Sequence, residues 1–237
     1  GASENALHAA WSSLTYGKVN KKEILIWGGT DGFCYGYENK TVEDEDGYDL
    51  FEPLWKVDCN EPNYRKDKEG KKIPYATPPG PSELIGTPVL YDGKVYCAIG
   101  QDPEHGDGVG RLSCINAEDG KVLWKYTDVG RTISTVSVAD DLVYIAEYAG
   151  IIHCLDANSG KVYWTHDSFS RIWGSTLVVD GKLILGNEDG DLLVMNHGKS
   201  KPKVKTVSMG APVYSSPVVS NGILYIGTQT HLYAIGE

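Results

Sequence analysis

The sequence predicts an all-β fold, a propeller whose blades are four-stranded antiparallel sheets. Gly is abundant at 28 of 237 residues, and Tyr outnumbers Phe by 15 to 3, a composition typical of short strands joined by tight turns. A polar two-residue turn recurs between apolar runs, beginning at Asp92, Asp140, Asp180 and Asn221. The resulting period is close to 40 residues, which is the length of one propeller blade.

Each repeat divides into four strands in the same order. The first strand precedes the turn, as in Thr87–Tyr91, and the second follows it, as in Val95–Ala98. Asx-Gly pairs suit this turn, because a type I′ hairpin needs a positive φ at both central residues. In the first repeat we place the turn at Val19-Asn20. A third strand, such as Leu112–Ile115, leads through a second turn to a fourth strand that ends in Trp.

These repeats predict about five blades, as one domain or as the C-terminal part of a larger propeller. The last repeat ends after its third strand, so either the segment Glu4–Ala10 or further blades before Gly1 should complete the fold; we favour the latter. Helix is expected at most as one turn over Asn5–Ala10. The expected blades cover approximately 11–58, 86–126, 132–166, 173–208 and 213–237, with insertions at 41–85 and 101–109.

Charge and hydropathy exclude two classes of protein. A net charge of −10 argues against nucleic-acid binding, and the apolar runs are too short to span a bilayer. The sequence has no CxxC pair, and its five cysteines are expected to be buried, reduced thiols. Cys114 and Cys154 occupy equivalent positions of neighbouring repeats, which should lie farther apart than the ~7 Å between Cα atoms that a disulfide tolerates, so we expect no bridge between them.

Two segments carry a recognisable motif, Ile115–Trp124 (INAEDGKVLW) and Leu155–Trp164 (LDANSGKVYW). They resemble the tryptophan-docking repeat, approximately A-x-D-x-x-T-G-K-x-x-W, of pyrroloquinoline-quinone (PQQ)-type β-propellers, in the quinoprotein alcohol dehydrogenase-like superfamily. The resemblance covers essentially the whole chain and implies that Trp55, Trp124 and Trp164 are structural docking residues between blades. The chain looks most similar to secreted bacterial propellers of unassigned role.

The resemblance leaves two kinds of function open. One is a non-catalytic, extracytoplasmic binding or scaffold propeller with no cofactor, like the propeller lipoprotein of outer-membrane barrel assembly. The alternative is a PQQ-dependent alcohol dehydrogenase-like oxidoreductase, or a fragment of one, in which PQQ and calcium would bind. We favour the first, because the sequence has no adjacent Cys pair and no clear set of metal ligands. The resemblance also implies a periplasmic or secreted location, with envelope or secreted protein partners or a small ligand at the channel mouth.

In propellers of this family, ligands bind on the face formed by the loops between blades and the turns between the second and third strands. Arg131 and Arg171 precede the first strand of consecutive repeats, and two guanidinium groups there would suit an anionic ligand. Interblade salt bridges are the competing interpretation. Trp173 would stack on a planar ligand or fill the core. The candidate ligand-binding residues on this face are Arg131, Thr132, Arg171, Trp173, Glu147 and Tyr148.

Acidic residues in two turns raise the question of a metal ion. The candidate metal ligands, clustered in the insertion at 101–109, are Asp102, Glu104, His105 and Asp107. A solvated acidic loop is the simpler interpretation. The same holds for the turn over 187–191, where Asp-Gly is explained by backbone geometry. His153 and His166 are expected to be structural.

Overall fold

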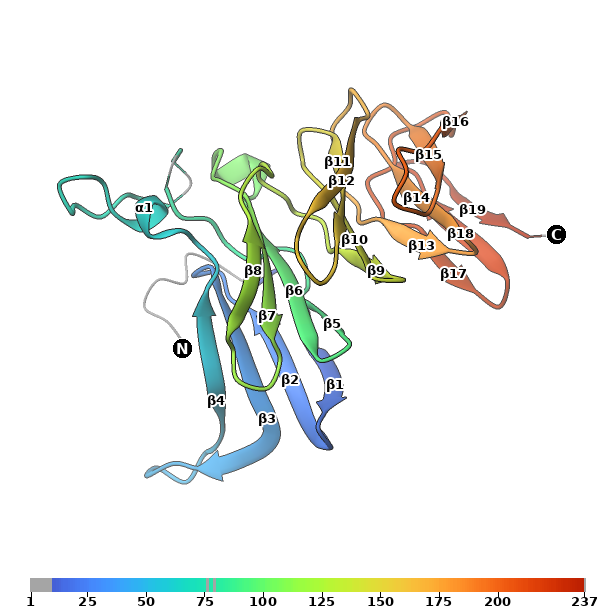
Figure 1. Ribbon diagram of the computed structural model, residues 1–237. Coiled ribbons are helices and arrows are strands. Elements are labelled where there is room, and N and C mark those ends of the chain that lie inside the picture. The colour runs from blue at the N-terminus through green and yellow to red at the C-terminus, as the bar shows by residue number, and fades with distance from the viewer. Residues whose placement is uncertain (1–9, 76, 79, 237) are drawn as a thin grey trace. The chain divides into compact units, whose positions relative to one another are not determined.

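The computed structural model describes residues 10–75, 77–78 and 80–236. Its strands form five antiparallel sheets, and within each sheet the strands pair in chain order, as Figure 1 shows. This architecture confirms the predicted all-β fold with about five blades. The chain divides into two compact units, Gly1–Arg131 and Thr132–Glu237.

Unit 1 contains two four-stranded sheets. The strands of the first are β1 (Thr15–Val19), β2 (Lys22–Gly28), β3 (Phe33–Glu43) and β4 (Asp49–Asp58). Those of the second are β5 (Val89–Tyr91), β6 (Lys94–Ile99), β7 (Arg111–Asn116) and β8 (Val122–Tyr126). Two short helices lie in the connections, α1 (Pro62–Arg65) and the 3₁₀ helix η1 (Pro103–His105).

Unit 2 contains three sheets, of four, four and three strands. The first is formed by β9 (Ser137–Ala139), β10 (Leu142–Ala146), β11 (Ile151–Asp156) and β12 (Val162–Asp167). The second is formed by β13 (Leu177–Val179), β14 (Lys182–Gly186), β15 (Asp191–Asn196) and β16 (Val204–Ser208). The third is formed by β17 (Val218–Ser220), β18 (Ile223–Gly227) and β19 (Leu232–Ile235), so among the described residues it ends after the third strand, as expected.

The recurrent turns have the predicted backbone. Both central residues have a positive φ in the pairs that begin at Asp92, Asp140, Asp180 and Asn221. The position predicted for the first turn is wrong by one residue: Asn20 and Lys21 have φ values of 48° and 68°, and β1 continues through Val19. This turn lacks the Gly that marks three of the others, which explains the error.

The long insertion differs from the expectation in extent and structure. Residues 41–43 and 49–58 belong to β3 and β4, so the chain leaves the first sheet only after Asp58 and enters the second sheet in β5. The segment also contains α1, although the only helical turn expected was at Asn5–Ala10, of which residues 5–9 lie outside the described residues. Arg65 anchors this segment through ionic hydrogen bonds of 2.7 Å to both carboxylate oxygens of Asp58.

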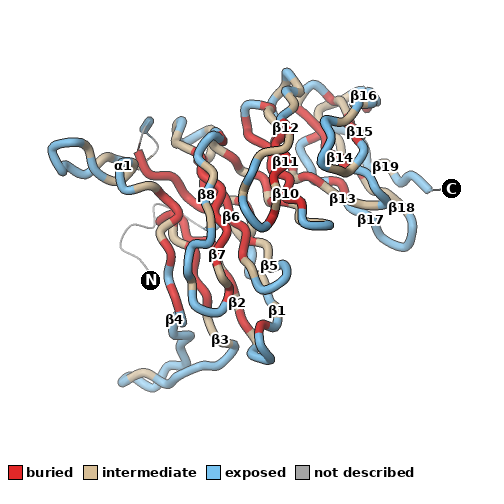
Figure 2. Tube along the Cα trace, viewed as in Figure 1, coloured by how far each residue is buried: buried red, intermediate tan, exposed pale blue. Residues whose placement is uncertain are grey.

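Apolar side chains are buried where neighbouring sheets of a unit pack together. Figure 2 shows buried residues concentrated in the middle strands, such as β6, β7, β10 and β11. In unit 1, Ile24 and Ile26 of β2 pack in one cluster with Val95 and Ile99 of β6. Alternation along β2 therefore gives the first sheet two distinct faces.

Two tryptophans in fourth strands, Trp55 of β4 and Trp164 of β12, contact the turn that follows the third strand of the next sheet in their own unit. The Trp55 indole donates a hydrogen bond of 2.9 Å to the carbonyl of Ala117. It lies against Gly120, where an added Cβ would come within 2.7 Å of the Trp55 Cβ. In unit 2, the Trp164 indole donates to the carbonyl of Gly198 at 3.0 Å. Trp124 lies beside Tyr96, with ring centroids 6.0 Å apart.

All five cysteines are buried and free, as expected. No helix among the described residues has the length and hydrophobicity needed to cross a bilayer.

Candidate functional site

The loops between sheets and the turns between their second and third strands meet on one face of unit 2. Backbone hydrogen bonds join them: Ile172 N–H donates to Tyr148 O at 3.1 Å, and Glu188 N–H donates to Arg171 O at 2.8 Å. The next loop repeats the pattern, with a bond of 3.0 Å from Val213 N–H to Asn187 O. We call the surface formed by the segments around Tyr148, Arg171, Asn187 and Val213 the loop face of unit 2. These backbone hydrogen bonds fix the positions of its segments.

A row of aromatic side chains crosses the loop face. The ring centroid of Trp173 lies 5.1 Å from that of Tyr148 and 5.7 Å from that of Tyr214, both in edge-to-face geometry. Tyr148 is buried, Trp173 is half-buried and Tyr214 is exposed. Such contacts fix the orientation of the rings, and Trp173 presents a large amphipathic surface at low entropic cost.

Arg171 and Glu188 flank this row. The Arg171 guanidinium lies 5.5 Å from the ring centroid of Tyr148, within the range of a cation–π contact. Its Nη1 lies 3.9 Å from Glu188 Oε2, the same oxygen that accepts a hydrogen bond of 3.2 Å from the Trp173 indole. The Arg171 side chain is still 61% exposed, so it has donors left for another molecule.

Phe169 projects from the same loop and is a functional candidate that the sequence reasoning missed. Its side chain is 88% exposed, and its φ of 56° is unusual for a bulky residue. Neighbouring side chains hold this turn: the Asp167 carboxylate accepts from Phe169 N–H, and the Ser168 hydroxyl contacts the carbonyls of Gly150 and Ser170. An aromatic residue between two serines in an interstrand loop was the available signal.

Thr132 and Glu147, two of the predicted ligand residues, are buried beneath this face. The Thr132 hydroxyl donates to Ala146 O at 2.6 Å. Glu147 Oε1 lies 2.7 Å from His153 Nε2, and both side chains are less than 10% exposed. These contacts tie the loop and turn to the sheet, which fits the structural role expected for His153.

Arg131 ends unit 1 and has partners of its own there. Its guanidinium donates to the backbone carbonyls of Gly106 and Asp107 in the 101–109 insertion. The two arginines of the predicted anion clamp thus have different surroundings, Arg171 with a carboxylate and an aromatic ring and Arg131 with backbone carbonyls. The clamp itself stays a prediction.

The acidic residues of the 101–109 insertion take part in local contacts. Asp102 accepts a hydrogen bond of 2.9 Å from Glu104 N–H, and its other oxygen lies 3.3 Å from His105 Nδ1. In the part of the chain that the structure describes, no group of three or more His, Cys, Asp or Glu side chains is arranged to hold a metal ion.

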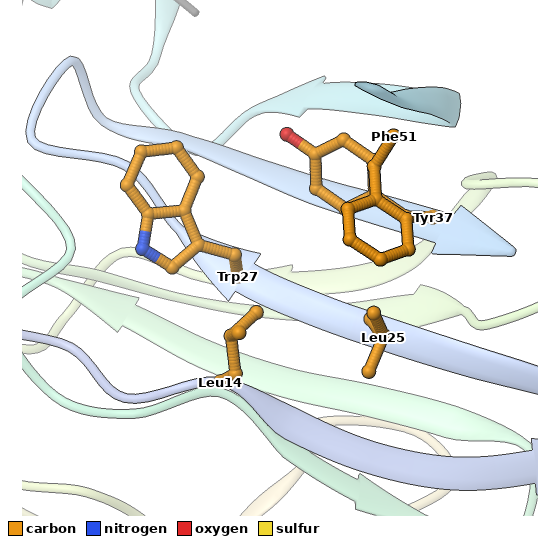
Figure 3. A pocket seen from close by; sticks show the side chains of 5 residues that line it. All are labelled: Leu14, Leu25, Trp27, Tyr37 and Phe51. Carbon is orange, nitrogen blue, oxygen red and sulfur yellow. The ribbon is translucent and has the colours of Figure 1, made fainter. Parts of the chain in front are cut away.

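An apolar pocket of about 290 Å³ lies on the first sheet of unit 1. Figure 3 shows Trp27, Tyr37 and Phe51 around it, with Leu14 and Leu25 along one side. Leu25 and Trp27 are the alternate residues of β2, on the side opposite to Ile24 and Ile26. This pocket is a second candidate surface, apolar and without the charged groups of the loop face.

Comparison with solved structures places this fold among propellers. BamB from Moraxella catarrhalis superposes with a TM-score of 0.69 at 13% identity, covering 98% of this chain and 60% of that one. A chain of the mitotic checkpoint complex gives 0.63 at 12% identity, covering 95% of this chain and 61% of that one. The quinohemoprotein alcohol dehydrogenase of Comamonas testosteroni gives 0.50 at 18% identity, covering 61% of this chain and 29% of that one. The chain thus spans about three fifths of the BamB structure.

The comparison with curated proteins gives no significant match. Residues 52–235 match the family described as outer membrane protein assembly factor BamB. That stretch contains both copies of the Gly-Lys-x-x-Trp motif and all sheets after the first. The chain belongs to this family of PQQ-repeat β-propellers.

Proposed function

We propose that this chain is a non-catalytic, extracytoplasmic propeller that binds protein partners through the loop face of unit 2. The observation that carries the proposal is the aromatic row Tyr148, Trp173 and Tyr214. Arg171 flanks this row, and its side chain stays largely exposed although it lies near Glu188. Trp, Tyr and Arg are the residue types that dominate binding energy at protein interfaces. The family match to an outer membrane assembly factor supports a scaffold role and an envelope location.

Phe169 would act as the protruding anchor of this interface. A large apolar side chain that is 88% exposed gains free energy when a partner removes it from water. The unusual φ of this residue adds no stability to the fold, and strained residues cluster at functional sites. The partner surface we expect is an apolar pocket beside a carboxylate, which would accept Phe169 and pair with Arg171.

The alternative, a PQQ-dependent oxidoreductase, has less support. The His153 imidazole and the Glu147 carboxylate bind each other in the interior, so this pair is not presented to a substrate on the loop face. Among the described residues, no three or more His, Cys, Asp or Glu side chains are grouped to hold a metal ion. We therefore assign no catalytic role to the residues of the loop face.

Site-specific photocrosslinking in the source cells tests the proposal. A benzoylphenylalanine in place of Phe169 should give an adduct with one defined protein, and Arg171→Ala or Trp173→Ala should sharply reduce the yield of this adduct. The matched control is Val207 of β16, 39% exposed in the same unit, which should give no such adduct. Identical adducts from both positions, or none from Phe169, would contradict a binding site here. Recovery of the adduct in the cytoplasmic fraction would contradict the proposed location.

A further inference from the structure

Three of the five cysteines converge in the core of unit 1. Cys34 lies in β3, Cys59 follows the end of β4, and Cys97 lies in β6 of the second sheet. All three belong to the apolar cluster between the two sheets, and none is more than 2% exposed. The fold therefore brings together thiols that are far apart in the sequence.

Cys97 is the centre of this group. Its Sγ lies 3.6 Å from Cys59 Sγ, and it also hydrogen-bonds with the Cys34 thiol. The contact between Cys59 and Cys97 connects the two sheets, because the former closes the first sheet and the latter lies in the second. In contrast, Cys154 in unit 2 has its thiol directed to the carbonyl of Gly198, at 3.7 Å.

Cys59 is better placed than Cys34 to bond covalently with Cys97. Cys34 lies inside β3, where it pairs with Gly28 on one side and Val57 on the other, so its backbone is held by two strands. Cys59 lies just beyond β4, where its N–H donates to Gly32 O at 3.0 Å. A disulfide needs an S–S distance near 2.05 Å. Each sulfur would thus move by less than ~1 Å, a shift that a residue outside a strand accommodates more readily.

Burial affects how such a bond would form. The hydrogen bond with Cys97, together with burial, raises the pKa of the Cys59 thiol, while the nearby Arg111 guanidinium partly opposes this shift. Hydrogen bonding with Cys34 and burial likewise raise the pKa of Cys97. Because the thiolate is the attacking species, exchange should be slow in the folded chain and faster while the chain folds.

We propose that Cys59 and Cys97 form a disulfide that links the first two blades, while Cys34 stays a thiol. Two thiol–disulfide exchanges make it: the thiolate of one cysteine attacks an external disulfide R–S–S–R and releases one RS⁻, and the second cysteine then displaces the other RS⁻. The two cysteines lose two electrons and two protons in total, and the external disulfide is reduced to two RSH. The bond closes a chain loop that contains the whole segment with α1.

Refolding of the chain in a mixture of reduced and oxidised glutathione tests this proposal. Peptide mapping without reduction should give a linked peptide pair containing Cys59 and Cys97, two hydrogen atoms lighter than the separate peptides, and two fewer alkylatable thiols. The midpoint of thermal unfolding should lie roughly 5–10 °C above that of the reduced chain.

Matched variants separate the bond from general effects of losing a core thiol. Cys34→Ser should keep both the linked peptide and the shift in midpoint, whereas Cys59→Ser and Cys97→Ser should lose both. The peptide map of the unaltered chain decides the matter even where a variant folds poorly. Five alkylatable thiols after oxidative refolding, or a linked peptide that contains Cys34, would overturn the proposal.

Discussion

Trp164 and Trp173 lie nine residues apart in unit 2, yet their surroundings differ in kind. Trp164 is buried in β12, where its indole bonds to Gly198 and its ring lies 5.8 Å from that of Tyr144. Trp173 is half-buried on the loop face and contacts two tyrosines and a carboxylate. The same residue type thus serves the framework between sheets in one place and an accessible surface in the other.

The largest expected effect is on the framework side of this comparison. Trp164→Ala should lower the free energy of unfolding by about 3–5 kcal/mol, because it leaves a cavity and removes the indole hydrogen bond to the Gly198 carbonyl. Trp173→Ala should cost only about 1 kcal/mol, since water can fill the space it leaves at the surface. Chemical denaturation of the two variants measures both values. Equal losses of unfolding free energy would contradict the distinction between a structural Trp164 and a surface Trp173.

A second contrast lies within a single strand of unit 1. Ile24→Ala should cost about 2–4 kcal/mol, because this side chain is buried between two sheets. Leu25→Ala, in the next position and beside the pocket of Figure 3, should cost less than about 1.5 kcal/mol. Thermal unfolding of both variants checks the difference. A larger loss for Leu25 would mean that the pocket is covered in the native protein.

More of the strands and turns of the sheets than of the loop face could be predicted from the sequence, because local sequence patterns specify strands and turns. Asx-Gly pairs specify the turns at Asp92 and Asp180 through the positive φ that they tolerate, and alternation specifies the strands between them. Asn20-Lys21 forms the same turn without the Gly, so its position could not be fixed to one residue. The helix α1 has only four residues and depends on the Arg65–Asp58 contact, which no local pattern reveals.

The candidate site could be predicted only in part, because it depends on contacts between repeats. The sequence identifies Arg171 and Trp173 as candidates from their place before a strand. Their contact with Glu188 could not be predicted, because Glu188 lies in the turn between β14 and β15 of the following sheet. Thr132 and Glu147 have the residue types of a ligand site, yet the fold buries them in contacts to Ala146 and His153. The exposure of a side chain such as Phe169 is a property of the folded surface.

A smaller effect on folding stability is expected in the turn that follows β11. The Asp156 carboxylate accepts hydrogen bonds from the Tyr163 hydroxyl and from Ser159, and these bonds lower its pKa below the usual 3.8. A lowered folded-state pKa stabilises the fold above the unfolded-state pKa, and this stabilisation is lost as the pH falls through the folded-state value.

Asp156→Asn should therefore cost a few tenths to about 1 kcal/mol at pH 7, with solvent screening keeping the value small. The difference from the parent chain should shrink as the pH falls from 3.8 through the lower folded-state pKa of Asp156. Denaturant titrations across this pH range measure it, and a difference that grows in acid would contradict the assigned hydrogen bonds.

The smallest effect on stability is expected at Phe169. Phe169→Gly relieves an unfavourable φ but makes the unfolded chain more flexible, so the free energy of unfolding should stay within about 1 kcal/mol of the parent. Binding to the partner should nevertheless be lost, as measured by crosslinking from position 214. Strong destabilisation of the Phe169→Gly variant would instead show that Phe169 stabilises the fold.

The most direct test of the central claim, that the loop face binds protein, combines crosslinking with stability. In the Trp173→Ala variant, the yield of the adduct from Phe169 should fall roughly 30-fold, as expected for an interface residue worth about 2 kcal/mol, while the free energy of unfolding changes by only about 1 kcal/mol. An undiminished adduct yield in a folded Trp173→Ala variant would contradict the claim.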